Sequence, residues 1–186
     1  QKNNKQLSLA YLKHIDNKSF HFKVITTFFI LLQLIFLWRF GIETKFEAAK
    51  YINQATHLIE TGTYTSSNFI FYSTQIWLIA FCLKMNIGFG FIVLIQILLN
   101  AISLWLFYCL IEHFVNRKRI AFLFTMALLL MVYYHIYNVY LFSESLYFSF
   151  SIIYTFYLLR LRTFSFTSFL FIFFFLLILL LTRPHV

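Results

Sequence analysis

The distribution of charge along the chain most restricts what it can fold into. A helix that crosses a bilayer needs about 20 consecutive, mostly apolar residues. Only 11% of the 186 residues are charged and 61% are hydrophobic, whereas soluble proteins carry about 25% charged residues. We therefore predict an all-α, polytopic transmembrane helix bundle, which excludes a soluble enzyme, a secreted disulfide scaffold and a disordered tail. The uncharged runs are Val24–Trp38, Thr61–Leu83, Met85–Ile111, Ile120–Ser143, Ser145–Leu159 and Thr163–Thr182.

The second run decides the number of crossings. It begins with polar residues, and its apolar part, Phe69–Leu83, has only 15 residues, a length that also suits an interfacial helix. If all six runs cross, the 15 Lys and Arg residues divide into 7 inside and 8 outside. If Phe69–Leu83 does not cross, they divide into 10 inside and 5 outside. Because positive residues concentrate on the cytoplasmic side, we predict about five crossings and one juxtamembrane helix.

This topology gives one domain with a basic extension. Residues 1–23 form a cytosolic segment that can lie on anionic headgroups, and residues 24–186 form the transmembrane module. We expect the C-terminus to be truncated, so that the chain is the front part of a longer protein. The net charge of +9 is explained by topology, and we predict no nucleic-acid partner. Cys82 and Cys109 lie in apolar runs, which favours packing residues over a disulfide.

The polar segment between the first two runs, residues 41–68, is the most informative loop. Apolar residues recur in it at helical spacing and predict an amphipathic helix over Thr44–Thr61, along the outer surface, with Gly62 as its stop. Glu43 and Glu47 then share a face of that helix. This face is either merely solvated, or one of its carboxylates is a general base beside a membrane-embedded substrate.

Three pieces of the sequence together resemble the GT-C glycosyltransferases, integral-membrane enzymes of the protein mannosyltransferase and aminoarabinose-transferase types. The first piece has Glu47, Tyr51, Ala55, Leu58 and Gly62 at the family's spacing, followed by Phe71-Tyr72-Ser73. The second, Leu141–Tyr147, resembles an outer turn that carries a carboxylate. The third, Thr182-Arg183-Pro184, resembles the Arg-Pro that closes a later span. Their order and spacing carry the resemblance, which extends from about Val24 to His185.

The resemblance implies a function for the outer (periplasmic or lumenal) face. A sugar would move from a polyprenyl-phosphate-linked donor to an unidentified acceptor, with inversion at the anomeric carbon. Glu47 is the expected catalytic base, and Lys50 and Arg183 are candidates for the phosphate. Glu144 would orient the acceptor or hold a cation. The expected substrate-binding residues are Lys50, Tyr51, Tyr72, Glu144 and Arg183.

The sequence departs from the family's pattern at two points of the site. The loop acid is Glu47 where the family usually has Asp, and Ser73-Thr74 stands where a Pro is common. Each candidate also has a structural interpretation: Lys50 as the i,i+3 partner of Glu47, Arg183 as a snorkelling helix end and Glu144 as an interfacial residue. His135 is either a buried contact between helices or a site group, and the tyrosines at positions 133, 134, 137 and 140 suit an interfacial belt.

Two other functions remain open at this level. A transporter or lipid-linked-sugar flippase would use polar groups in mid-membrane, for which Gln33, Gln96, Asn100 and His135 are the candidates. A structural assembly subunit would leave the pattern around Glu47 unexplained. We predict no cofactor and no metal site, since Cys/His pairs at ligand spacing and an Asp-x-Asp motif are both missing, although the family leaves room for a divalent cation.

Overall fold

In the computed structural model, which describes residues 17–161 and 165–183, every regular element is a helix. Most of the predicted cytosolic segment, and Pro184 of the predicted Arg-Pro, lie outside the described residues. The elements in chain order are α2 (Lys18–Phe40), α3 (Glu47–Thr61), the 3-10 helix η1 (Ser67–Tyr72), α4 (Ser73–Lys84), α5 (Gly90–Val115), α6 (Lys118–Leu129), α7 (Val132–Val139), α8 (Ser143–Arg160) and α9 (Phe166–Leu180).

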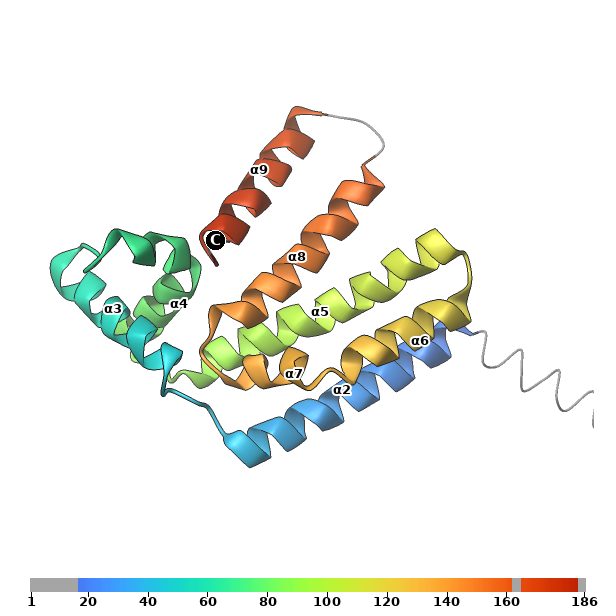
Figure 1. Ribbon diagram of the computed structural model, residues 1–186, viewed down its shortest axis with the longest axis horizontal. Helices are drawn as coiled ribbons and strands as arrows, with labels where there is room; N and C mark the ends of the chain where they lie inside the picture. The colour runs from blue at the N-terminus through green and yellow to red at the C-terminus, as the bar shows by residue number, and fades with distance from the viewer. Residues whose placement is uncertain (1–16, 162–164, 184–186) are drawn as a thin grey trace, which may run out of the picture.

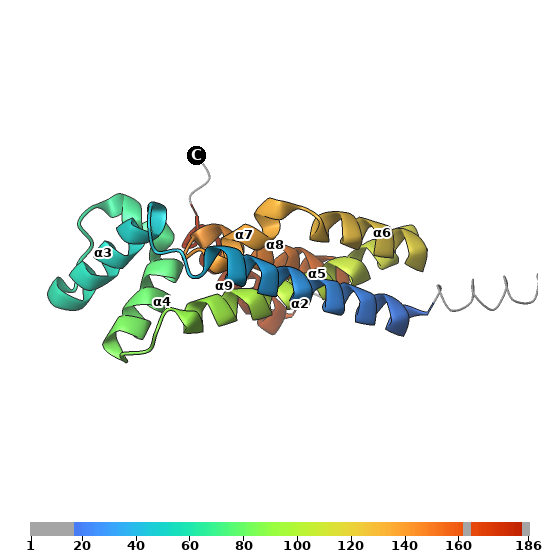
Figure 2. The same ribbon diagram turned by 90° about the horizontal axis from the view of Figure 1, so that it is seen from below.

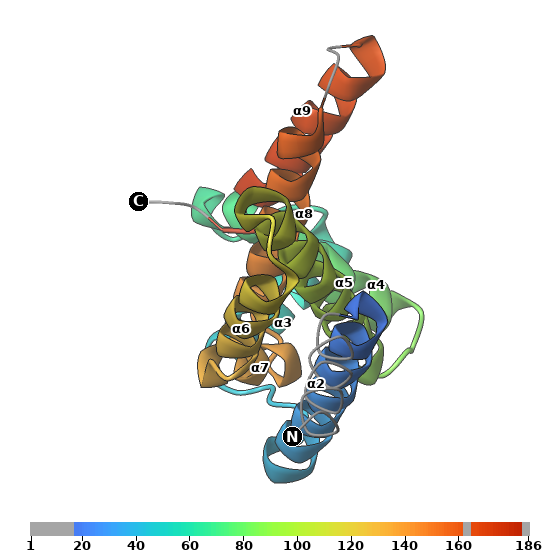
Figure 3. The same cartoon turned by 90° about the vertical axis from the view of Figure 1, so that its right-hand side faces the viewer.

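The long helices run between two ends of an elongated molecule (Figure 1). One end, here called the loop end, carries residues 41–85 with α3, η1 and α4, and the N-terminal ends of α5 and α8. The other, here called the turn end, carries the α5–α6 turn at residues 116–117, the start of α2 and the end of α8. Figure 3 views the molecule from the turn-end side and shows α9 at the edge of the bundle, beyond α8.

Two of these helices have the character of membrane spans. α2 and α5 are long and apolar enough to cross a bilayer, and α6 with α7 makes a third candidate if the bent pair is one span. Leu34 on α2 and Leu98 on α5 are 58% and 54% exposed, as lipid-facing side chains are in a helix that is apolar all round. α9 has only 15 residues, and four serines lower the apolar character of α8. The all-helical fold of the described residues is confirmed, whereas five crossings stay a prediction.

The segment predicted not to cross takes a distinct orientation. The predicted apolar stretch Phe69–Leu83 is divided between η1 and α4, and α4 lies across the loop end rather than alongside α5 (Figure 2). Its 12 residues span about 18 Å at 1.5 Å per residue, well short of the roughly 30 Å of a hydrocarbon core. Its length and its orientation both agree with a juxtamembrane helix.

The helix of the first loop has its own hydrophobic core at the loop end. Ala48, Tyr51 and Ala55 on α3 are buried against α4, where Ile76 and Ile79 are fully buried. The predicted apolar face is confirmed at these three positions of α3, whereas Ile59, which was predicted to belong to it, is 45% exposed. Gly62 ends the helix in the left-handed conformation with φ 73°. This is the conformation for which glycine is favoured after a helix.

Both cysteines, Cys82 and Cys109, are free thiols.

The predicted start of this helix is wrong by three residues. The helix begins at Glu47 rather than Thr44, because the residues before it take part in other interactions. Glu43 forms a single parallel β-bridge with Tyr140, and its carboxylate accepts a hydrogen bond from the Lys45 backbone N–H at 3.0 Å. Glu43 and Glu47 consequently do not share a helix face.

The predicted run Ile120–Ser143 is not one helix. It breaks after Leu129 into α6 and α7, which are bent by 54° relative to each other. The Nε2 atom of His135 lies 2.5 Å from the Leu129 carbonyl oxygen, so a side chain occupies an acceptor that a continuous helix would use for its own backbone. Nδ1 of the same ring lies 2.7 Å from Gln33 Nε2 on α2. His135 is thus a buried contact between helices, as one of its two interpretations predicted.

Only part of the predicted belt of tyrosines is exposed, as a position in the interface requires. Tyr133 is 73% exposed, whereas Tyr134 is buried, and its hydroxyl lies 2.7 Å from the Ser103 hydroxyl on α5. Consecutive residues of a helix point in different directions, which is why the two neighbours have opposite surroundings.

Candidate functional site

Two backbone connections bring distant parts of the chain together at the loop end. The Glu43 N–H donates to the Val139 carbonyl at 3.1 Å, and the Leu141 N–H donates to the Glu43 carbonyl at 3.4 Å. The Thr74 N–H, at the start of α4, donates to the Leu181 carbonyl after α9 at 3.1 Å. The first loop is therefore joined to the segment before α8, and α4 is joined to the end of α9. Glu144 and Arg183 follow these two segments in the chain.

Tyr51 lies at the centre of these segments. It is 4% exposed, and its ring centroid is 5.3 Å from that of Tyr72. Burial raises the pKa of the Tyr51 hydroxyl, a hydrogen bond with Ser143 opposes this effect, and nearby Glu144, Tyr72 and Glu47 raise the pKa further. A phenol is already protonated at neutral pH, and the upward shift keeps the Tyr51 hydroxyl protonated at higher pH as well, so that it can donate a hydrogen bond.

An ion pair lies beside Tyr51. Arg183 Nη1 is 3.5 Å from Glu144 Oε1, and the side chains are 42% and 18% exposed. The other carboxylate oxygen of Glu144 accepts a hydrogen bond from the Ser143 hydroxyl at 3.5 Å. Glu144 stands in the first turn of α8, where the helix dipole favours a negative charge. An ion pair, a hydrogen bond and the helix dipole therefore all stabilise the Glu144 carboxylate.

A second ion pair lies at the start of α3. Lys50 Nζ is 2.5 Å from Glu47 Oε1, and the side chains are 61% and 50% exposed. This is the i,i+3 pairing that the sequence predicts for Lys50. Exposed pairs of this kind contribute only about 0–1 kcal/mol, so a ligand can separate the two side chains at little cost.

The backbone just before Glu47 is strained. Phe46 has φ 55° and ψ −124°, a conformation that residues other than glycine rarely adopt. It stands in a tight turn in which the Ala48 N–H donates to the Lys45 carbonyl at 3.2 Å. Strained backbone persists where the surrounding structure imposes it, and such positions cluster at functional sites. The turn fixes the direction in which α3, and with it Glu47, leaves the loop.

The chain matches no protein-family model, no curated protein and no solved structure. The resemblance to GT-C glycosyltransferases consequently rests on the residue pattern of this chain.

All six residues predicted for the site lie at the loop end. Glu47, Lys50 and Tyr51 come from α3, Tyr72 from the end of η1, Glu144 from α8 and Arg183 from the segment after α9. Their contacts join them into one group around Tyr51 and one exposed pair at the start of α3, with Glu47 close enough to Tyr51 to raise its pKa.

Sequence reasoning missed Ser143 and the structural role of Glu43. Ser143 hydrogen-bonds Tyr51 and Glu144, and its position directly before Glu144 is the signal that could have identified it. Glu43 acts through its backbone N–H and carbonyl, which every residue possesses, so no side-chain pattern marks it.

The arrangement provides three chemical functions within a small region. Two carboxylates, Glu47 and Glu144, are able to accept a proton, and two cations, Lys50 and Arg183, are able to bind an anionic group. The ring of Tyr72, partly exposed beside Tyr51, offers a surface on which a sugar can stack. In the described part of the chain, no three His, Cys, Asp or Glu side chains converge as a metal site requires.

Proposed function

We propose that the chain belongs to an integral-membrane glycosyltransferase that moves a sugar from a polyprenyl-phosphate-linked donor to an acceptor hydroxyl. The gathering of Glu47, Tyr51, Glu144 and Arg183 at one end of an apolar helix bundle carries the proposal. These residues come from three segments, which the sequence singles out separately. An amphiphilic donor needs its charged phosphate at a polar end of such a bundle and its hydrocarbon chain against the apolar helices.

The proposed reaction is a single displacement. The acceptor oxygen attacks the anomeric carbon from the face opposite the phosphate, the C1–O bond to phosphate breaks, and the configuration inverts. Glu47 takes the proton of the acceptor hydroxyl, while Arg183 binds the departing phosphate. Lys50, which is held by Glu47 in the free protein, exchanges that carboxylate for the donor phosphate and so leaves Glu47 able to accept the proton.

The proposed function also fixes an orientation. With five crossings, the loop end lies on the outer (periplasmic or lumenal) side and the N-terminus in the cytosol. Four of the five glutamates are at the loop end, whereas the consecutive cations at residues 117–119 are at the turn end. This charge distribution supports the orientation, because the positive-inside rule places the turn end in the cytosol.

A transporter or lipid-linked-sugar flippase is the second candidate. The break between α6 and α7 and the fully buried side chains of Gln96 and Asn100 favour it, since transporters use broken helices and polar groups in mid-membrane. The charged residues of the loop end favour chemistry at the surface instead. An assay of sugar transfer in detergent, where no compartments exist, separates an enzyme from a transporter.

The test of the proposed base is Glu47→Gln in the full-length protein. A positioned base contributes about 10²–10⁴-fold to the rate, so we expect a loss of that order in the transfer of sugar from a polyprenyl-phosphate donor to an acceptor. The unfolding temperature should stay nearly constant, because a half-exposed carboxylate contributes little to stability. Glu47→Asp should retain part of the activity, since Asp is the form usual in the family.

Glu60→Gln is the matched control, because Glu60 is an exposed carboxylate at the other end of the same helix. It should leave the transfer rate near wild type. Wild-type turnover by Glu47→Gln would show that Glu47 is not the base, and Glu144 and Glu43 would then be the next residues to change.

A further inference from the structure

The turn end carries a concentration of positive charge that the proposed reaction does not use. Residues 117–119 are three consecutive cations in and after the α5–α6 turn, and Arg160 ends α8. The first turn of α6 has no acidic residue. Among the acidic residues that the structure describes, Glu112 alone lies at this end, and Lys18 already binds its carboxylate at 2.6 Å. Positive charge is therefore in excess here.

Two hollows open among these cations. Residues 116–120 line one of about 600 Å³, and the other, of about 580 Å³, is lined by His113, Leu159, Arg160 and Leu161. Both volumes fall in the range of roughly 300–1,000 Å³ that holds small ligands in proteins. The first hollow combines three basic side chains with the Asn116 carboxamide, and such a lining favours an anion with several acceptor oxygens.

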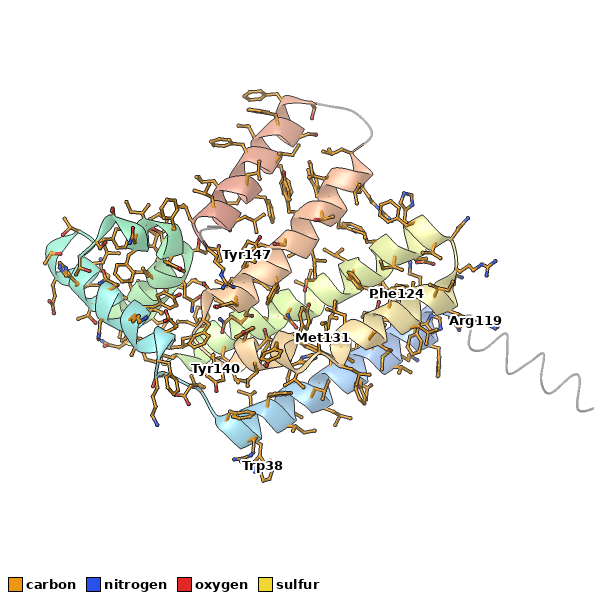
Figure 4. The ribbon with its side chains drawn as sticks, viewed as in Figure 1. Trp38, Arg119, Phe124, Met131, Tyr140 and Tyr147 are labelled. Atoms are coloured by element: carbon orange, nitrogen blue, oxygen red, sulfur yellow. The ribbon has the colours of Figure 1, made fainter. Side chains whose placement is uncertain are left out.

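Exposed apolar side chains stand on the two helices that flank the first hollow. Phe114, in the last turn of α5, is 60% exposed, and Leu123 and Phe124 on α6 are 64% and 56% exposed. Figure 4 shows Arg119 and Phe124 on the same helix, with Arg119 nearer the turn end. A ligand that satisfies both surfaces has an anionic head and hydrocarbon chains.

We propose that the hollow lined by residues 116–120 binds the headgroup phosphate of an anionic phospholipid in the leaflet at the turn end. Arg117 and Lys118 provide the charge, and an arginine can donate two parallel hydrogen bonds to a phosphate. The acyl chains lie along the exposed residues of α5 and α6. Free inorganic phosphate shares the headgroup chemistry, but the adjoining apolar surface assigns the site to a lipid. This site is independent of the proposed function, since it lies at the opposite end of the molecule.

The experiment compares two lipid probes in bilayers of phosphatidylcholine that contain the purified full chain. Electron spin resonance with spin-labelled phosphatidylglycerol and spin-labelled phosphatidylcholine gives their relative association constants. We expect the wild type to prefer phosphatidylglycerol. In the double variant Arg117→Gln/Lys118→Gln, the ratio of the two association constants should fall about fivefold for each cation removed. The lower limit of this ratio is 1, at which the protein no longer prefers either lipid.

Two further variants separate a local site from the effect of total charge. Lys45→Gln/Lys84→Gln removes the same charge at the loop end and should keep the preference, and Arg117→Lys keeps the charge and should keep most of it. Circular dichroism verifies that each variant is folded. The proposal would be overturned if the Arg117→Gln/Lys118→Gln variant preferred phosphatidylglycerol as strongly as the wild type does. It would also be overturned if the Lys45→Gln/Lys84→Gln variant lost as much of this preference as the Arg117→Gln/Lys118→Gln variant. A preference abolished by inorganic phosphate, but not by sodium chloride of equal ionic strength, would assign the hollow to a soluble anion and overturn the lipid assignment.

Discussion

Glu144 and Arg183 are the residues at which binding and structural roles can be separated. Arg183 is 42% exposed, and exposed ion pairs contribute about 0–1 kcal/mol. We therefore expect a double-mutant cycle of Glu144→Gln and Arg183→Gln to show less than about 1 kcal/mol of coupling in the free energy of unfolding. If Arg183 stabilises the leaving phosphate, Arg183→Gln alone should lower the transfer rate about 10²-fold. If the transfer rate of Arg183→Gln falls only in proportion to the fraction of protein that remains folded, the ion pair has a structural role only.

Phe46 allows a test of backbone strain without disturbing a core. Its side chain is 75% exposed, so its removal costs little packing, whereas its φ of 55° suits glycine. Phe46→Gly should exceed Phe46→Ala in free energy of unfolding by about 1 kcal/mol, because both lack the ring and only glycine relieves the strain. Chemical denaturation of the two variants measures the difference. Equal stability would show that the turn relaxes at no cost when the ring is absent.

Most residues of the candidate site could be predicted from the sequence, but Ser143 and the connections between the segments were not. Tyr51, Glu144 and Arg183 belong to spaced patterns in the sequence, and the structure brings them together. The interactions that join them include backbone hydrogen bonds such as that from Thr74 to Leu181. A bond between N–H and C=O groups uses no particular side chain, so its partners are visible only once the chain is folded.

Among the helices, the contact between α2 and α7 includes one buried polar pair beside the packing of Phe29 and Phe36 on His135. Gln33 is 3% exposed and His135 is 1% exposed, and their side-chain nitrogens lie 2.7 Å apart. Polar contacts between membrane helices average about 0.6 kcal/mol and reach about 1.7 kcal/mol. We expect Gln33→Leu to lower the free energy of unfolding by that amount, measured by denaturation in mixed micelles. A double-mutant cycle with His135→Phe should give coupling of the same size, and additive effects would mean that the contact contributes nothing.

Helix positions could be predicted from the apolar runs more reliably than helix ends and breaks could. The predicted run Met85–Ile111 corresponds to α5, because length and hydrophobicity alone decide such a helix. No proline or glycine stands near Leu129 in the sequence to indicate the break. It depends on His135 reaching a backbone carbonyl six residues earlier, which is a property of the folded chain rather than of a local pattern.

For the molecule as a whole, the central prediction is which end faces which side of the membrane. Single cysteines at positions 84 and 117, introduced after Cys82 and Cys109 are replaced by alanine, test it in intact cells or vesicles. A membrane-impermeant thiol reagent outside should label position 84 and not position 117, since the loop end is expected to face outward. Labelling at 117 but not at 84 would rule out five crossings with the N-terminus inside.

The backbone bridge between Glu43 and Tyr140 has a consequence for how such a protein can change over time. The link between the first loop and the start of α8 consists of main-chain atoms, so substitutions at these two positions leave it intact unless proline removes the N–H of residue 43. Mutation can therefore alter the side chains at these positions while the main-chain connection between the first loop and the segment before Glu144 is retained. Distant relatives would keep this geometry after their residues at the bridge no longer resemble those found here, and comparison of backbone paths would detect them where comparison of residues fails.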